Sequence, residues 1–296
     1  MLKNIIRALR LPFVTASILP FIFGSLIQRH HFNFAGFLLG LIAVVSTHLS
    51  SNLINDYADS KSGADWKDKN FYGFFGGSKL IQEKIFPEGF YLKLSITFAL
   101  IAAFSVIALA LLLKNPLVVV LYALIIIIGW QYSAKPLQFS YHMLGEIVIF
   151  MLFGPALVMG GYFIQTGIFP DLKSFILSAP FGFFTTAILF SNEIPDFQDD
   201  KASGKLTWVN FFGPQGSYIL YVLLILLGFY FISLSMLFGF LGKISIIAFL
   251  LLALAFKAAL ILKSDYADKI KLMESSKLTI ALQALVSIVL IAGLLI

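Results

Sequence analysis

Two short stretches of this chain each hold a group of closely spaced acidic residues, and the first of them directly follows a long apolar segment. It contains Asn52, Asn55, Asp56 and Asp59, and His48 lies one helical turn before it. On a continuing helix these residues are three or four positions apart and therefore share one face. A polar face on an apolar helix points into a bundle or a wet cavity. Two carboxylates so close repel each other, and Mg²⁺ relieves that repulsion while it bridges to the phosphate oxygens of a ligand.

The second acidic stretch repeats this pattern after a later apolar segment. Asn192, Asp196 and Asp200 follow one another at spacings of four, and Pro195 predicts a distorted helix end there. Lys205 comes shortly afterwards and supplies a cation suited to phosphate oxygens. The two stretches together predict a divalent-cation site for a phosphorylated ligand.

The polar residues between the two stretches have simpler explanations. Gly76-Gly77-Ser78-Lys79 is flexible and carries one more basic group. Its spacing does not match that of the nucleotide P-loop, so an ATP site of that type is excluded. Four further acids are expected to cap helices or balance lysines in solvated loops, namely Asp65, Asp68, Glu83 and Glu88.

The composition shows that membrane helices must position these groups. Of the 296 residues, 59% are hydrophobic and only 12% are charged, which is too little polar surface for a soluble protein of this length. There is no Cys, so disulfides, thiolate metal sites and cysteine nucleophiles are excluded. The basic start of the chain leads into an apolar run without a clear cleavage site, which indicates a retained first helix. We expect an all-α, polytopic membrane protein.

Apolar segments long enough to cross a bilayer, about 20 residues each, occur nine times. With nine spans and the N-terminus in the cytoplasm, only Arg29, Lys114, Lys173 and Lys243 of the 21 basic residues fall outside. This bias predicts an outer C-terminus and places both acidic stretches on the cytoplasmic side. It also accounts for the net charge of +6 without a nucleic-acid partner. The expected spans are residues 12–28, 34–54, 92–113, 116–133, 145–166, 174–192, 215–238, 243–262 and 278–296.

The two acidic motifs resemble those of the UbiA superfamily of intramembrane prenyltransferases. The pattern is Asn-Asp-Xaa-Xaa-Asp at 55–59, followed by Asp-Xaa-Xaa-Xaa-Asp at 196–200. Within the superfamily, the chain looks most like the 1,4-dihydroxy-2-naphthoate polyprenyltransferases of menaquinone biosynthesis. Glu193, Pro195 and Trp208 depart from that branch, which bears on the acceptor rather than on the metal chemistry. Further similar stretches are residues 9–20, 76–79, 132–137, 145–146, 153–155, 165–167 and 204–207.

The resemblance implies a single domain over residues 1–296, with about nine helices around a central cavity. It implies Mg²⁺-dependent transfer of a polyprenyl group from an isoprenyl diphosphate to a small aromatic quinone precursor, with 1,4-dihydroxy-2-naphthoate as the expected acceptor. The catalytic metal ligands would be Asp56, Asp59, Asp196 and Asp200. The substrate-binding residues would be Asn52, Asn55 and Asn192 beside the metal, Lys79, Lys135 and Lys205 at the diphosphate, Arg10 at an acceptor carboxylate, His48 at the acceptor or a phosphate, and Tyr132 beside the allylic cation.

Two other functions remain open on the sequence. The prenyl group could go to another acceptor, such as a different aromatic, a glycerol phosphate lipid or a tetrapyrrole. Alternatively, intramembrane acids could couple cations to transport, although transporters place such carboxylates near the bilayer midplane. Here the acids lie at helix ends beside lysines, which favours the enzyme. We expect an integral protein of a bacterial cytoplasmic membrane, with its site facing the cytoplasm.

Overall fold

The computed structural model describes residues 1–64, 66 and 68–296, and the regular structure of these residues is helical throughout. Asp65, which the sequence assigns to a solvated loop, lies outside the described residues. The helices are α1 (Leu2–Ala8), α2 (Thr15–Leu26), α3 (Phe34–Ser62), α4 (Glu88–Leu113), α5 (Leu117–Gln131), α6 (Gly145–Met151), α7 (Leu157–Thr166), α8 (Leu172–Ala202), α9 (Trp208–Phe212), α10 (Tyr218–Leu237), α11 (Leu252–Ser264) and α12 (Lys269–Leu295).

The described residues contain seven helices that are long and apolar enough to cross a membrane. A pair of segments bent by 48°, Leu2–Ala8 and Leu11–Leu26, makes an eighth if it is counted as one span. The short apolar helix α5 has 15 residues. Each of the nine expected segments falls on helical residues, so the all-helical membrane class is confirmed. The count of nine spans and the orientation of the two ends remain predictions.

The two helices that carry the acids continue well beyond the expected spans. α3 extends past the predicted end at residue 54 to Gly63, whose φ of 89° is the left-handed conformation that glycine adopts readily at a helix end. α8 begins at Leu172, is capped by the side chain of Asp171, which accepts the N–H of Ser174, and continues through Pro195 to Ala202. The helix therefore continues through Pro195 instead of ending there, and the neighbouring Ile194 is packed in the apolar core shared with α10 and α12. Both acidic motifs lie on helix.

The span predicted over residues 145–166 is interrupted in the middle. A π-helical stretch, Leu152–Ala156, separates α6 from α7 and includes Pro155. At this break the backbones come very close, because a Cβ on Gly154 would lie 2.9 Å from the Cα of Gly182 on α8. The glycine pair lets the interrupted helix pack directly on α8, which is one of the two acid-bearing helices.

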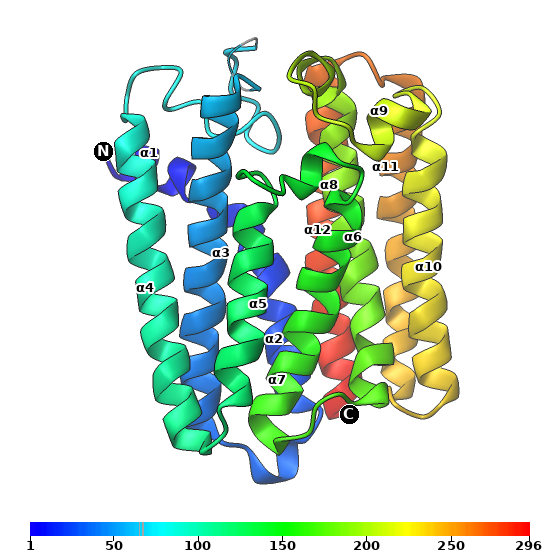
Figure 1. Ribbon diagram of the computed structural model, residues 1–296. Coiled ribbons are helices and arrows are strands. Elements are labelled where there is room, and N and C mark those ends of the chain that lie inside the picture. The colour runs from blue at the N-terminus through cyan, green and yellow to red at the C-terminus, as the bar shows by residue number, and fades with distance from the viewer. Residues whose placement is uncertain (65, 67) are drawn as a thin grey trace.

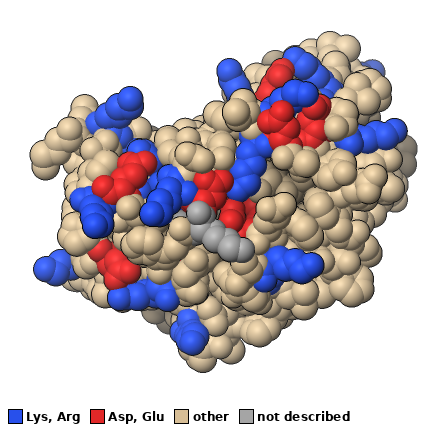
Figure 2. All heavy atoms as spheres, turned by 90° about the horizontal axis from the view of Figure 1, so that it is seen from above, with Lys and Arg blue, Asp and Glu red and all other residues tan. Residues whose placement is uncertain are grey.

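The helices form one bundle in which the acid-bearing ends of α3 and α8 lie at the same end (Figure 1). The segments that follow α3, α5, α8 and α11 all lie there. Seen from this end, acidic and basic side chains lie next to one another on the surface (Figure 2). The α4–α5 hairpin, predicted from the tight turn at Lys114 to Pro116, is present. A large apolar core of α8, α10, α11 and α12 holds α8 in place.

Candidate active site

A cavity of about 360 Å³ lies among the helices α2 to α8. Gly40 and Asp59 of α3 both line it, which at about 1.5 Å per residue makes it roughly 28 Å long along that helix. Around Gly40 the walls are apolar and include Phe21, Leu109 and Phe163. Charged groups line the end near Asp59. The cavity therefore joins a polar end to a deep apolar interior.

The first acidic pair lies on the last turns of α3. Asp56 is buried, and its Oδ2 accepts the backbone N–H of Ser78 at 3.2 Å, while Arg10 Nη1 lies 3.6 Å from its Oδ1. Asp59 lines the cavity and accepts a long hydrogen bond of 3.5 Å from the Tyr141 hydroxyl. Both carboxylates thus lie among donors and a cation at the polar end.

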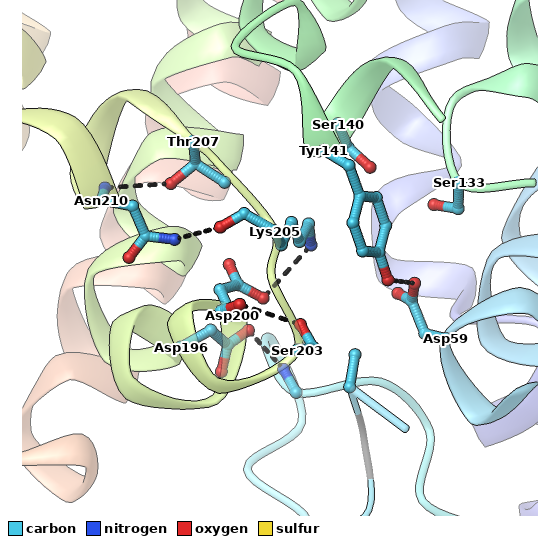
Figure 3. A network of polar contacts seen from close by, with 12 residues as sticks. Asp59, Ser133, Ser140, Tyr141, Asp196, Asp200, Ser203, Lys205, Thr207 and Asn210 are labelled. Atoms are coloured by element: carbon cyan, nitrogen blue, oxygen red, sulfur yellow. Dashed lines mark hydrogen bonds and ion pairs between the residues drawn. The ribbon is translucent and has the colours of Figure 1, made fainter. Parts of the chain in front are cut away.

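The second acidic pair lies on the last turns of α8, across the cavity from Asp59 (Figure 3). Asp196 Oδ2 accepts the backbone N–H of Gly76 at 2.9 Å. Asp200 is buried, and its Oδ1 lies 3.3 Å from the Lys205 ammonium. Asp59, Asp196 and Asp200 therefore line the same cavity from opposite walls, whereas the buried Asp56 does not line it and instead contacts Ser78 and Arg10.

A tight turn in the segment between α3 and α4 touches both walls. Gly76 and Ser78 each donate a backbone N–H to one acid of a different pair. The turn depends on left-handed backbone at Gly76 (φ 70°), Gly77 (φ 73°) and Lys79 (φ 58°), which is easy for the glycines. Lys79 is buried and lines the cavity. This turn supplies donors and a cation directly between the acids.

Two side chains outside the membrane helices, Lys205 and Tyr141, contact the carboxylates at the polar end. Burial favours the neutral form of Lys205, but the negative charges of Asp200 and Asp59 outweigh it and raise the pKa of the ammonium above its ordinary value. Burial and the charge of Asp59 also raise the pKa of the Tyr141 hydroxyl to about 12. Lys205 is therefore a cation and Tyr141 a neutral donor throughout the physiological pH range.

The donor set fits Mg²⁺ bound together with a phosphorylated ligand. Among the described residues, no three carboxylates or imidazoles come together around one point. Instead, the acids form two pairs on opposite walls. Mg²⁺ commonly takes one or two carboxylates and completes its shell with water and substrate phosphate oxygens. Each pair is suited to such partial coordination, and the space between them is where the phosphates would lie.

Most of the other predicted residues line the same cavity. Asn52 donates to the carbonyl of Leu9 at 3.3 Å, and His48 Nδ1 lies 2.6 Å from the Ser17 hydroxyl. Lys135 differs, because its side chain is exposed and does not line the cavity. The predicted residues that do line the cavity are Arg10, His48, Asn52, Asn55, Lys79, Tyr132, Asn192 and Lys205.

Several residues of the site were not predicted from the sequence. Tyr141 and the backbone amides of Gly76 and Ser78 contact the acids directly. The Gly-Gly pair before Ser78 was the available signal, since such turns expose consecutive amides that bind anions. Nothing local in the sequence pointed to Tyr141.

Two of the departures from the naphthoate branch lie on either side of one buried carboxyl group. Glu193 is buried, lines the cavity and lies on α8, which packs against the helix α6 that carries Glu146. Glu146 Oε1 also accepts the backbone N–H of Trp208 at 2.7 Å. The departures at Glu193 and Trp208 therefore belong to a single local structure beside the cavity.

The fold and the site define an integral-membrane helical protein with carboxylates and cations at one end of a deep apolar cavity. The sequence model of the UbiA prenyltransferase family matches residues 17–282, and the chain belongs to that family. This confirms the predicted superfamily and, at the level of the family, the predicted enzyme class.

Known proteins resemble the chain in sequence and in fold. The human UbiA prenyltransferase domain-containing protein 1 is 30% identical over 231 residues, which cover 75% of this chain but only 64% of the human protein. The chain thus spans less than two thirds of that relative. A UbiA homolog from Aeropyrum pernix K1 has the same fold, with a TM-score of 0.72, 18% identity and coverage of 95% and 96% of the two chains. A UbiA homolog from Archaeoglobus fulgidus, solved with DMAPP and Mg²⁺, gives a TM-score of 0.66, 18% identity and coverage of 97% and 98%.

Proposed function

We propose that the protein transfers a polyprenyl group from an isoprenyl diphosphate to an aromatic quinone precursor, with 1,4-dihydroxy-2-naphthoate as the acceptor. The observation that carries this proposal is the cavity. Its polar end collects carboxylates from α3 and α8 together with Lys79 and Lys205, and its deep end is apolar, with roughly 28 Å along α3 from Gly40 to Asp59. A diphosphate with a long hydrocarbon chain has the same division into a charged head and an apolar tail. The Archaeoglobus homolog bound to DMAPP and Mg²⁺ supports this choice of ligand.

The chain's own residues at the polar end would bind and orient the diphosphate. Bound Mg²⁺ would neutralise the negative charge that builds up as the allylic carbon–oxygen bond breaks. Asp56, Asp59, Asp196 and Asp200 would hold the metal, with Asn52, Asn55 and Asn192 beside them. Lys79 and Lys205 would stabilise the leaving diphosphate through fixed positive charge.

The cavity wall next to the acids would hold the allylic cation and the acceptor. Tyr132 lines this part of the cavity and offers an electron-rich ring to a carbocation. Arg10 lines the same region and has five donors, enough to bind an acceptor carboxylate besides its contacts with α3. His48 would hydrogen-bond the acceptor or a phosphate. The dry walls would exclude water, which would otherwise capture the cation.

The enzyme is favoured over a cation-coupled transporter by the position of the acids. They lie on the last turns of α3 and α8, whereas transporters place coupling carboxylates near the middle of the membrane. A different acceptor is the remaining alternative. We infer that residues 1–296 form one domain in a bacterial cytoplasmic membrane, with the polar end of the cavity in the cytoplasm.

Purified full-length protein in nanodiscs tests the proposal. Labelled geranylgeranyl diphosphate would be offered with 1,4-dihydroxy-2-naphthoate and a panel of other acceptors, in Mg²⁺ or in EDTA. We expect transfer only with Mg²⁺, and a loss of roughly a hundredfold or more in Asp196→Ala. Asp265→Ala is the matched control, because this acid pairs with Lys271 and does not line the cavity.

Different results would overturn the metal dependence and the identity of the acceptor separately. Full activity in EDTA or in Asp196→Ala would contradict the metal-dependent mechanism. Transfer to another acceptor of the panel, but not to the naphthoate, would show that the protein is a prenyltransferase with a different acceptor.

A further inference from the structure

Lys269, the first residue of α12, joins two acids from distant parts of the chain. Its ammonium lies 2.8 Å from Asp199 Oδ2 on α8 and 2.8 Å from Asp68 Oδ2 in the segment between α3 and α4. A positive charge in the first turn of a helix is disfavoured by the helix dipole. The two carboxylates offset that disadvantage.

The contact with Asp68 continues to the turn that touches the acidic pairs. Asp68 Oδ2 also accepts the hydroxyl of Tyr72 at 3.0 Å, and the Tyr72 ring stacks on Phe75 with centroids 5.0 Å apart. Phe75 is buried and directly precedes Gly76, whose N–H binds Asp196. A short series of contacts therefore connects α12 to the donor turn.

Lys269 also contacts α8, the helix whose Asp196 accepts the N–H of Gly76. It pairs with Asp199, which lies between the two metal-binding acids of α8 in sequence and lines the cavity. The pairing directs the Asp199 carboxylate to an ammonium of α12 and fixes α8 relative to the segment that carries Gly76. Both sides of the Gly76–Asp196 contact are thus tied to one side chain.

We propose that Lys269 is a positioning residue that holds the turn of Gly76 to Lys79 against the acids and so sets affinity for the isoprenyl diphosphate. This inference rests on the proposed function and adds a residue from the last helix to it. Lys269 does not line the cavity, and it acts through its contacts with Asp68 and Asp199.

The test compares Lys269→Met with Lys271→Met in the full chain. Lys271 lies in the same turn of α12 but pairs with Asp265, away from the cavity. We expect Lys269→Met to raise the KM for geranylgeranyl diphosphate about tenfold, with little change in the KM for the acceptor. Lys269→Arg should restore the KM, because a guanidinium can bind both carboxylates. Lys271→Met should leave it unchanged.

Hydrogen exchange at the amides of Gly76 and Ser78 supplies a readout that needs no catalysis. We expect faster exchange in Lys269→Met and in Asp68→Asn, no further increase in the double variant, and wild-type exchange in Lys271→Met. Unchanged exchange in Lys269→Met would overturn the inference. Failure of the wild type to transfer to any acceptor would instead overturn the proposed function, and the exchange result would still decide the role of Lys269.

Discussion

The ammonium of Lys205 lies 3.3 Å from Asp200 Oδ1, and both side chains line the polar end of the cavity. Because Lys205 remains charged there, it is placed to stabilise a diphosphate as it leaves. We expect Lys205→Met to lower kcat by about 10- to 100-fold. Lys135→Met should change kcat by no more than about twofold, since that side chain is exposed outside the cavity wall. Steady-state kinetics of both variants check this, and equal losses would contradict it.

Arg10 allows the acceptor to be probed directly. Its guanidinium donates to Asn55 Oδ1 at 3.3 Å and lies 3.6 Å from Asp56 Oδ1. These two contacts use only part of the five N–H donors of the guanidinium. We expect Arg10→Gln to raise the KM for an acceptor with a carboxylate about tenfold. The KM for an analogue without the carboxylate should rise less. A similar rise for both acceptors would mean that Arg10 serves only the acidic pair of α3.

Alanine substitutions at two neighbouring glycines of α7 should have opposite effects on the stability of the fold. A Cβ on Gly161 would lie 2.6 Å from the carbonyl oxygen of Phe21 on α2, whereas a Cβ on Gly160 would meet nothing within 4 Å. We expect Gly161→Ala to destabilise the fold by about 1–3 kcal/mol through overpacking. Gly160→Ala should be neutral or stabilise it by roughly 0.5–1 kcal/mol, because alanine favours helix. Thermal unfolding of both variants in one detergent measures the difference, and a lower Tm for Gly160→Ala than for Gly161→Ala would refute it.

The ion pair of Lys269 with Asp68 should be insensitive to pH near neutrality. Burial favours the protonated carboxyl of Asp68, but hydrogen bonds from Lys269, Asn70 and Tyr72 outweigh it and lower its pKa from 3.8 to about 2. A lowered pKa means that the stabilisation is complete above the ordinary value and is lost as the pH falls towards 2.

The expected result is a constant ratio of KM for the diphosphate between Lys269→Met and wild type from about pH 5 to pH 8. Kinetics at several pH values within this range check it. A ratio that falls to one at about pH 5 would show that Asp68 is not held in its charged form.

The sequence supported the membrane class and the acidic motifs because both depend on local patterns. Apolar runs of span length and polar residues three or four positions apart are visible without any long-range contact. The same patterns could not place helix ends. α3 and α8 continue to Ser62 and Ala202, well past their apolar runs, so an apolar run sets only the minimum length of its helix. The π-helical stretch at Leu152–Ala156 contains Pro155, which is a local signal, whereas the close approach of Gly154 to Gly182 is a tertiary contact that the sequence did not predict.

The sequence by itself determined which groups are available: paired carboxylates on one face of each of two helices, basic residues near them, and helices apolar enough for a membrane. The tertiary structure decided which of those groups meet. It placed Lys205 in the cavity and Lys135 outside it, and it brought Lys269 to Asp68 and Asp199. The physical reason is that helical periodicity fixes the face on which a side chain lies, whereas its partners across the cavity depend on how separate helices pack and on where the connecting turns direct their backbone amides.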